Sequence, residues 1–329
     1  MPRSERPVTL VMLPPQTAAT RAWARRLEQD VPKLAVHVPE DEAGVRALLP
    51  EADAAFGTLT PDLLALAPRL RWLQAPAAGP VPGYFFPEMA GHPMTVTNLR
   101  GIHRDVVATH AVALVLALAR QLPLYLHHQV RREWVPHPAA RSPLHLPKAT
   151  VVLVGSGEIG AEVARMLAAF GCRILAVDER RTSPPAGAAE LHPAADLDQL
   201  LPAADVVVVT VPHTPETENM FDASRFALLR DHAFFVNVGR GPVVDVDALA
   251  DAIESGRLGG AGMDVFPEEP LPADHPLWGL PQVIVTPHSA SFGVDDVLDD
   301  RIYDIIRTNA ECFANDRELV NVVDPARWF

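Results

Sequence analysis

Three loops of this sequence carry side chains that could do chemistry together: an arginine, two adjacent carboxylates and a histidine. Arg240, the pair Glu268 and Glu269, and His288 each follow closely after an apolar run typical of a buried β-strand. Arginine is planar and permanently charged, so it can hold the carboxylate of a 2-oxo acid in a forked pair of hydrogen bonds and polarise the ketone oxygen. Histidine can deliver the proton that accompanies hydride transfer and take it back in the opposite direction. The set predicts reversible reduction of a ketone next to a carboxylate.

The three loops follow strands of one predicted parallel sheet, and the carboxyl ends of parallel strands meet at one edge of a sheet. A carboxylate beside the histidine would favour its protonated form. Each residue alone has a simpler interpretation, as a solvated loop charge or as a cap on a strand end, and it is their joint placement that favours a common site. Several other histidines are expected to pack or to lie at the rim of a cofactor site, among them His103, His110 and His213.

A glycine-rich turn lies between a strand pattern and a helical pattern. Four apolar residues, 151–154, predict a fully buried strand, a helix follows, and a second apolar strand closes the unit on Asp178. The turn consists of Gly155, Ser156, Gly157, Glu158, Ile159 and Gly160. Its glycines would allow a tight turn, close approach of a pyrophosphate and close helix packing, and the helix N-terminus would attract the phosphates. Glycines that serve only packing would leave the acid at the strand end unexplained, so we predict that a nicotinamide dinucleotide binds here.

The residues after the second strand bear on the choice of cofactor. Asp178 would accept hydrogen bonds from the adenosine ribose and would repel a 2′-phosphate, which favours NAD. Arg180 and Arg181 just beyond it could instead attract a 2′-phosphate. We therefore predict NAD, with NADP as the alternative.

Length, net charge and cysteine content limit the class of protein and the partners that we expect. A length of 329 residues predicts about two domains, and a net charge of -13 with no basic run makes nucleic acid an unexpected partner. Cys172 and Cys312 lie far apart and outside metal-ligand spacing, so we expect no disulfide framework, no metal site and a cytoplasmic location. Pro14 ends the first apolar run too early for a signal peptide, and the longest apolar stretch, 106–119, is too short to span a bilayer, so no membrane partner is expected.

Alternating strand and helix patterns predict an α/β protein of two domains. Residues 100–289 are expected to form a doubly wound parallel sheet, a Rossmann domain for NAD(P), and residues 1–99 with 290–329 a smaller, discontinuous, flavodoxin-like substrate domain. A long apolar helix over 101–122 and a last helix over 294–313, returning to the first domain, are part of this prediction. The remaining predicted strands are 8–13, 34–38, 54–56, 70–74, 174–177, 206–209, 234–238, 262–265 and 283–285.

Four runs are similar, in order and spacing, to the signature of the D-2-hydroxyacid dehydrogenase family: 238–245, 262–271, 275–278 and 286–288. The resemblance implies that Arg240 binds the substrate carboxylate, that His288 is the catalytic acid and base, and that Glu269 is its partner. It also implies a cofactor site that includes Val211, Pro212, Thr217, Val238, Gly239 and Asp264, the last of these facing the nicotinamide amide.

The first domain carries part of the same resemblance. The loop with Ala78 and Gly79 resembles the segment whose backbone N–H groups meet the substrate carboxylate. The family resemblance also implies a homodimer in which residues near Trp134 reach the partner's site. Two residues depart from the common pattern: Ala77 replaces a serine, and Thr109 stands where many members have glutamate.

The resemblance favours an oxidoreductase that acts on a 2-oxo acid or D-2-hydroxy acid, with glyoxylate or hydroxypyruvate reduction as the leading prediction. A protein of another class remains open: a non-catalytic sensor of NAD(H), similar to the dehydrogenase-like transcriptional corepressors, can keep the same motifs.

Overall fold

The chain passes from one structural unit into a second and returns to the first. The computed structural model describes residues 6–79, 84–139, 142–293 and 295–324. Unit 1 comprises residues 1–102 and 293–329, and unit 2 comprises residues 103–292. The boundaries expected from the sequence, after residues 99 and 289, fall within a few residues of these.

In the described part of unit 2, seven parallel strands form one sheet in the order β12-β11-β10-β9-β6-β7-β8. The strand order reverses between β6 and β9, which is the topological switch point of a doubly wound sheet. The prediction of a Rossmann-type sheet is therefore confirmed. The strands are β6 (Thr150–Val154), β7 (Arg173–Val177), β8 (Glu190–His192), β9 (Val206–Val209), β10 (Ala233–Asn237), β11 (Leu258–Met263) and β12 (Val283–Val285).

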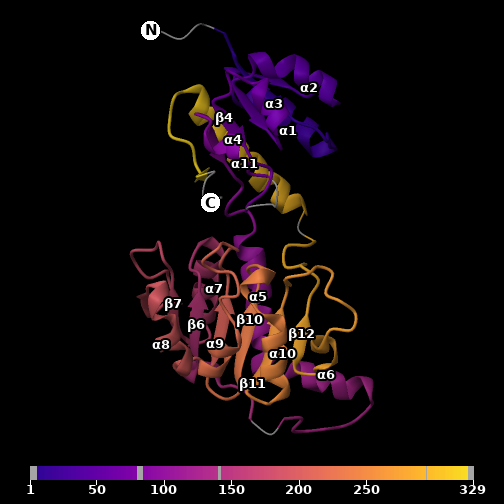
Figure 1. Ribbon diagram of the computed structural model, residues 1–329, viewed down its shortest axis with the longest axis vertical. Helices are drawn as coiled ribbons and strands as arrows, with labels where there is room; N and C mark the ends of the chain where they lie inside the picture. The colour runs from indigo at the N-terminus through magenta and orange to yellow at the C-terminus, as the bar shows by residue number, and fades with distance from the viewer. Residues whose placement is uncertain (1–5, 80–83, 140–141, 294, 325–329) are drawn as a thin grey trace. The chain divides into compact units, whose positions relative to one another are not determined.

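Helices cover both faces of this sheet (Figure 1). Alternate side chains of β6 enter different cores: Val151 and Leu153 pack with α5 and α7, whereas Val152 and Val154 pack with α8, α9 and α10. Burial on both faces explains why the strands are almost continuously apolar. The helices are α5 (Arg104–Ala119), α6 (Leu122–Val130), α7 (Glu158–Ala168), α8 (Leu197–Leu200), α9 (Ala223–Leu228) and α10 (Val246–Glu254), with 3₁₀ turns at Leu146–Lys148, Ala194–Asp196, Leu201–Ala203, Gly241–Val243 and Pro276–Gly279.

The long helix predicted over 101–122 is shorter at both ends. Gly101 has a φ of +98° just before α5, and Gln121 has a left-handed φ of 58° just after it. These two conformations interrupt the helical backbone, and α6 then leaves α5 at an angle of 70°. Within the described residues no single helix is both long and apolar enough to span a membrane; α5 and α6 meet those criteria only as this bent pair.

The strand β11 begins four residues before the predicted start at 262, at Leu258. Gly259 and Gly260 concealed this part because glycine has low strand propensity. A side chain has no room there: a Cβ on Gly260 would lie 2.3 Å from the backbone oxygen of Gln282 in the neighbouring chain segment. Strands β5, β8 and β13, of two or three residues each, were not predicted.

Unit 1 has a sheet in the order β13-β5-β4-β3-β1-β2 within the described residues, parallel except for β13, which pairs antiparallel with β5. The order β2-β1-β3-β4-β5 is that of flavodoxin-like folds, as predicted. Its strands are β1 (Val8–Met12), β2 (Leu34–His37), β3 (Ala54–Phe56), β4 (Trp72–Gln74), β5 (Thr95–Thr97) and β13 (Val322–Val323). Its helices are α1 (Ala18–Asp30), α2 (Glu42–Leu48), α3 (Pro61–Ala65), α4 (Pro87–Ala90) and α11 (Asp295–Ala314), with a 3₁₀ turn at Leu49–Glu51.

The last helix returns to this unit, as the sequence predicts. In Figure 1, α11, in yellow, lies beside the indigo and purple elements of the first hundred residues. Tyr303 of α11 is fully buried, and its hydroxyl donates a hydrogen bond to Asp30 at the end of α1. Ile306 and Phe313 add apolar contacts to the core that α1 covers.

Candidate active site

Arg240 lies in the turn that follows β10, and a buried amide fixes that turn. Asn237 is fully buried; its Oδ1 accepts from the N–H of Gly239 at 2.9 Å, and its Nδ2 donates to the backbone oxygen of Arg240 at 3.1 Å. The side chain of Arg240 donates to the oxygen of Gly239 at 2.7 Å. Burial lowers the pKa of the Arg240 guanidinium from its ordinary value, and the negative charge of Glu269 opposes part of this effect.

The turns after β10 and β11 are pressed together. A Cβ on Gly241 would lie 1.9 Å from the carbonyl carbon of Phe266, which is less than any non-bonded contact allows. Only glycine permits this approach of two backbones. It brings the segment with Arg240 next to the segment with Glu269, as expected from their common edge of the sheet.

His288 and Glu269 form a pair. His288 Nδ1 lies 2.8 Å from Glu269 Oε2, and Glu269 Oε1 accepts from the N–H of Phe266 at 2.9 Å. The side chains are 53% and 37% exposed, so a small molecule can reach them from solvent. Of the two adjacent carboxylates that the sequence offered, it is Glu269 and not the exposed Glu268 that contacts the histidine.

The backbone at His288 is left-handed, with a φ of 49°. Its N–H donates to the oxygen of Asp264 at 2.8 Å. The carboxylate of Asp264, in a residue only 1% exposed, accepts from the Thr286 hydroxyl at 2.6 Å and from the N–H groups of Ser289 at 2.9 Å and Ala290 at 3.2 Å. Asp264 therefore shapes the turn that carries His288, while its predicted contact with the nicotinamide stays a prediction.

The glycine-rich turn has the geometry of a dinucleotide cradle. Gly155 has a φ of +88°, and a Cβ there would lie 2.8 Å from Val211 Cγ1; a Cβ on Gly160 would lie 2.1 Å from the oxygen of Gly155. A Cβ on Gly157, in contrast, would meet no described atom within 4 Å. Gly157 is the N-cap of α7, whose first residues are Glu158 and Ile159. Two glycines are thus required by packing, and the third leaves open space at a helix N-terminus, which fits a pyrophosphate.

Asp178 closes this cradle. Its Oδ2 accepts from the N–H of Ser156 at 2.7 Å and the Ser156 hydroxyl at 3.1 Å, and its Oδ1 accepts from the N–H groups of Arg180 at 2.9 Å and Arg181 at 3.0 Å. The Arg181 guanidinium donates to the oxygen of Ser156 at 2.7 Å. Partial burial raises the pKa of Asp178, but these donors outweigh burial and leave the pKa below its ordinary value.

The loop after β9 lies against both glycine-containing turns. A Cβ on Gly239, which follows the buried Val238, would lie 2.5 Å from the oxygen of Val211. The hydroxyl of Thr217 donates to the oxygen of Pro212 at 2.7 Å and accepts from the N–H of Thr214 at 2.8 Å. These bonds fix the loop next to the cradle, where the sequence placed it as part of the cofactor site.

The predicted substrate residues of unit 1 follow β4. Ala78 and Gly79 lie in a bend and are half-buried, and the N–H of Leu99 donates to the oxygen of neighbouring Ala77 at 3.0 Å. This loop belongs to unit 1, whereas Arg240, Glu269 and His288 all belong to unit 2.

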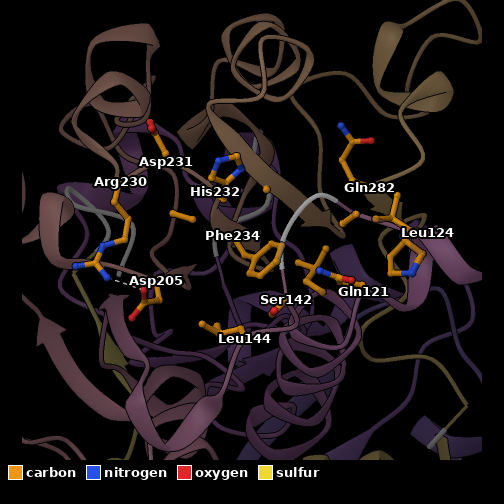
Figure 2. A pocket seen from close by; sticks show the side chains of 15 residues that line it. Gln121, Leu124, Ser142, Leu144, Asp205, Arg230, Asp231, His232, Phe234 and Gln282 are labelled. Carbon is orange, nitrogen blue, oxygen red and sulfur yellow. Dashed lines mark hydrogen bonds and ion pairs between the residues drawn. The ribbon is translucent and has the colours of Figure 1, made fainter. Parts of the chain in front are cut away.

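A hollow of about 310 Å³ lies at the opposite edge of the unit 2 sheet (Figure 2). It is lined by residues at the amino ends of strands, such as Phe234 and Gln282, and by the ion pair of Arg230 with Asp205 at 2.7 Å. None of the predicted catalytic residues lines it. Among the described residues, no group of three or more His, Cys, Asp or Glu side chains could hold a metal ion.

Three residues that support the site have no role in the sequence-based prediction. Asn237 reads as one more strand residue between two valines, and Thr286 lies in a signature run without an assigned task. His110, expected to pack or to lie at the rim of a cofactor site, lies with its Nε2 3.0 Å from the hydroxyl of Thr286. The hydrogen bonds of Thr286 and His110 link segments far apart in the sequence, so no local pattern could have indicated them, whereas those of Asn237 stay within its own turn.

Comparison with known proteins identifies the family. Residues 112–290 match the sequence model of the D-isomer specific 2-hydroxyacid dehydrogenase, NAD binding domain. The chain belongs to the D-isomer specific 2-hydroxyacid dehydrogenase family. Unit 2 is the NAD-binding domain of this family, and the sequence-based recognition is confirmed.

The family is also evident in individual relatives. A glyoxylate reductase from Thermofilum pendens is 36% identical over 214 residues, which are 64% of this chain and 62% of that protein. A D-3-phosphoglycerate dehydrogenase from Mycobacterium tuberculosis is 36% identical over 75% of this chain and 47% of its own length. The matched part thus spans about half to two thirds of these two relatives.

Among solved structures, a D-isomer specific 2-hydroxyacid dehydrogenase from Xanthobacter autotrophicus Py2 in complex with NADPH and MES resembles this chain over nearly its whole length. The TM-score is 0.80 at 28% sequence identity, with 98% of this chain and 100% of that chain covered. The two-domain architecture of the dehydrogenase is therefore present here.

Proposed function

We propose that this protein catalyses hydride transfer between a nicotinamide cofactor and a 2-oxo acid or D-2-hydroxy acid. The single observation that carries the proposal is the pair of His288 and Glu269, 2.8 Å apart, on the sheet edge that also carries Arg240 and the glycine cradle. Membership of the dehydrogenase family supports the same reaction class.

Each residue of the site has a distinct task in this proposal. When bound, the nicotinamide supplies or accepts the hydride. Arg240 holds the substrate carboxylate and polarises its ketone oxygen. His288 gives that oxygen a proton from Nε2, because its Nδ1 is bound to Glu269. Glu269 orients the imidazole and stabilises its charged form, while Ala78 and Gly79 of unit 1 stay proposed substrate contacts on the strength of the sequence resemblance alone.

NAD is the proposed cofactor and NADP the alternative. Four protein donors occupy the roughly four acceptor positions of the Asp178 carboxylate, so we expect Asp178 to act on cofactor choice mainly through its charge. Its low pKa keeps that charge at neutral pH, and a carboxylate repels a 2′-phosphate. The positive charges of Arg180 and Arg181 would instead attract the 2′-phosphate and favour NADP. A ratio of kcat/KM values for NADH and NADPH above one supports the proposed preference, and a ratio below one assigns the two arginines the larger effect.

Glyoxylate or hydroxypyruvate is the proposed substrate, in keeping with the glyoxylate reductase among the relatives. The test is oxidation of NADH or NADPH with glyoxylate, hydroxypyruvate, pyruvate and longer 2-oxo acids. Turnover fastest with the first two supports the proposal, and turnover fastest with a longer acid changes the substrate but not the reaction. Binding of cofactor without turnover of any of these acids would favour the NAD(H) sensor instead.

A homodimer is the proposed assembly. None of the nine residues of α6 is buried. Five large apolar side chains, in α6 and just after it, are exposed, and we call this surface the α6 face: Leu122, Tyr125, Leu126, Val130 and Trp134. Large exposed apolar surfaces mark protein interfaces, and a second copy would cover this one. A cytoplasmic location completes the proposal, supported by the free thiols of Cys172 and Cys312.

A further inference from the structure

A chain of hydrogen bonds leads from helix α5 to the turn that carries His288. His110 Nε2 lies 3.0 Å from Thr286 Oγ1 and 3.5 Å from Asp264 Oδ1, and Thr286 Oγ1 lies 2.6 Å from the same Asp264 oxygen. The Asp264 side chain is 2% exposed and that of His110 is 23% exposed, so the chain is largely shielded from water. A shielded polar network with all its members bonded holds its parts in one arrangement.

The direction of the hydrogen bonds follows from the chemistry of the groups. The Asp264 carboxylate accepts from the N–H groups of Ser289 and Ala290, and as a carboxylate it can only accept from Thr286. The single hydroxyl proton of Thr286 therefore points to Asp264. Thr286 must accept from His110, so the proton of the His110 ring is assigned to Nε2.

The turn at the end of this chain needs to be held. The left-handed backbone of His288, with a φ of 49°, is uncommon for any residue other than glycine and persists only where the surroundings fix it. Asp264 supplies that support on both sides of the residue, through its own backbone oxygen to the N–H of His288 and through its carboxylate to the next two N–H groups. The conformation of the turn in turn sets where the imidazole of His288 meets Glu269.

We propose that His110 is a positioning residue for the reaction: by donating to Thr286 it keeps Asp264 and the 286–290 turn in the one arrangement that holds His288 on Glu269. The inference rests on the proposed function, in which His288 transfers the proton. It gives a specific task to a histidine of the long helix for which the sequence indicated only packing or a place at the rim of the cofactor site.

The first test compares His110→Phe, which keeps a ring but removes the donor, with His110→Gln, whose amide nitrogen reaches a similar position. We expect kcat for the preferred 2-oxo acid to fall roughly 10- to 100-fold in His110→Phe, because a small misplacement of a catalytic group has effects of this size. His110→Gln should recover most of kcat. Thr109→Ala is the matched control: Thr109 is exposed, and its hydroxyl bonds the oxygen of Asp105 in its own helix at 2.7 Å.

The second test does not depend on turnover. Amide hydrogen exchange of residues 286–292, measured by mass spectrometry, should be faster in His110→Phe than in wild type, His110→Gln or Thr109→Ala, because the N–H groups of Ser289 and Ala290 lose a fixed acceptor. Thr286→Val should have the same effect, and combining it with His110→Phe should add little, because both changes break one chain. Thr286→Ser, which keeps the hydroxyl, is the control for Thr286→Val and should exchange like the wild type.

The outcomes separate the inference from the proposed function. Unchanged exchange in His110→Phe, or equal losses of kcat in the phenylalanine and glutamine variants, overturns the positioning role. No turnover by the wild type with any 2-oxo acid overturns the proposed function and the catalytic part of the inference with it, whereas faster exchange reversed by glutamine would still support the structural link.

Discussion

His288 is the residue on which the proposed chemistry depends, and it sits in an unusual conformation. A left-handed backbone at a residue other than glycine costs on the order of 1–3 kcal/mol. Here three N–H groups bonded to Asp264 offset that cost. The result is an imidazole whose Nδ1 is fixed on a carboxylate and whose Nε2 is the nitrogen that we expect to meet the substrate.

Replacing this side chain tests its role without disturbing the turn. Asparagine tolerates left-handed backbone better than alanine, so His288→Asn should fold normally. Its kcat should be lower by roughly two to four orders of magnitude, the usual contribution of a general acid. Steady-state kinetics of 2-oxo acid reduction measure this, with the exposed His145→Asn as control. A kcat close to that of the wild type would remove His288 from the mechanism.

Arg240 offers a test of substrate binding. Lysine keeps the positive charge but cannot form the forked pair of hydrogen bonds, so Arg240→Lys should raise the KM for the 2-oxo acid roughly 10- to 100-fold, the value of one or two bonds to a charged group. The Kd for NADH, measured by fluorescence titration, should change little. An unchanged KM would mean that the carboxylate binds elsewhere.

At the scale of elements, the glycines of the cradle between β6 and α7 have two different roles, packing and cofactor binding. Gly160 and Gly155 are tied to neighbouring atoms, whereas the space beside Gly157 is open. Gly157→Ala should therefore leave the free energy of unfolding within about 1 kcal/mol of the wild type, because its φ of -61° suits alanine.

The same variant should raise the Kd for NADH on the order of 10-fold, because a methyl group would weaken one hydrogen bond between backbone and phosphate. Calorimetric titration measures the Kd, and Gly279→Ala, also in open space but outside the cradle, is the control. A loss of stability without a change in Kd would contradict the assignment of this space to the pyrophosphate.

The segment after β7 gives a prediction for pH. The pKa of Asp178 in the folded protein lies below its ordinary value of 3.8. The carboxylate therefore stabilises the fold above the unfolded pKa, and this stabilisation is lost as the pH falls through the folded pKa. Asp178→Asn should lower the free energy of unfolding by roughly 1 kcal/mol at neutral pH, about one net hydrogen bond.

That difference should be constant between neutral pH and about pH 5, and it should shrink below about pH 4 as the wild type loses its charge. Urea unfolding followed by circular dichroism at several pH values measures it. A difference that grows in acid would show that Asp178 does not stabilise the loop through its charge.

The sequence predicts some elements more completely than others, because some depend on contacts with residues that are distant in the sequence. The run 206–209 is four valines and its strand is found as predicted, since burial on both faces requires a continuous apolar pattern. The predicted start of β11 was wrong because the two glycines there allow neighbouring chain segments to approach closely. The same limit applies to the site: the order of motifs indicates Arg240, Glu269 and His288, but the bond between Thr286 and His110 spans 176 residues and leaves no local pattern.

At the scale of the whole molecule, unit 2 is inserted into unit 1, and the sequence predicts this arrangement because the apolar face of the last helix needs a partner. Tyr303 and Ile306 find it in the core beside α1. The α6 face shows the opposite case, an apolar surface that the described residues of this chain leave exposed. The resemblance to the family implied a second copy that would cover it.

A charge on the α6 face tests the proposed dimer. Leu126 is 58% exposed, so Leu126→Glu should not affect folding, but a buried unpaired carboxylate at an interface should convert a dimer to a monomer at micromolar concentration. Light scattering after size exclusion measures the mass. Phe170→Glu, at an apolar residue that is 43% exposed and lies outside the face, is the control and should remain dimeric. A wild type that is already monomeric would refute the assembly itself.

The contact between Gly241 and Phe266 has a consequence for the variation that this chain can tolerate. Because a single added carbon at position 241 would overlap a backbone carbonyl, selection for folding alone should hold that position as glycine. In a library with every substitution at position 241, the survivors of a screen for soluble expression should already be almost entirely glycine. Position 241 would then remain glycine even in variants that no longer turn over substrate. A glycine at this position would therefore report on folding and not on catalytic activity.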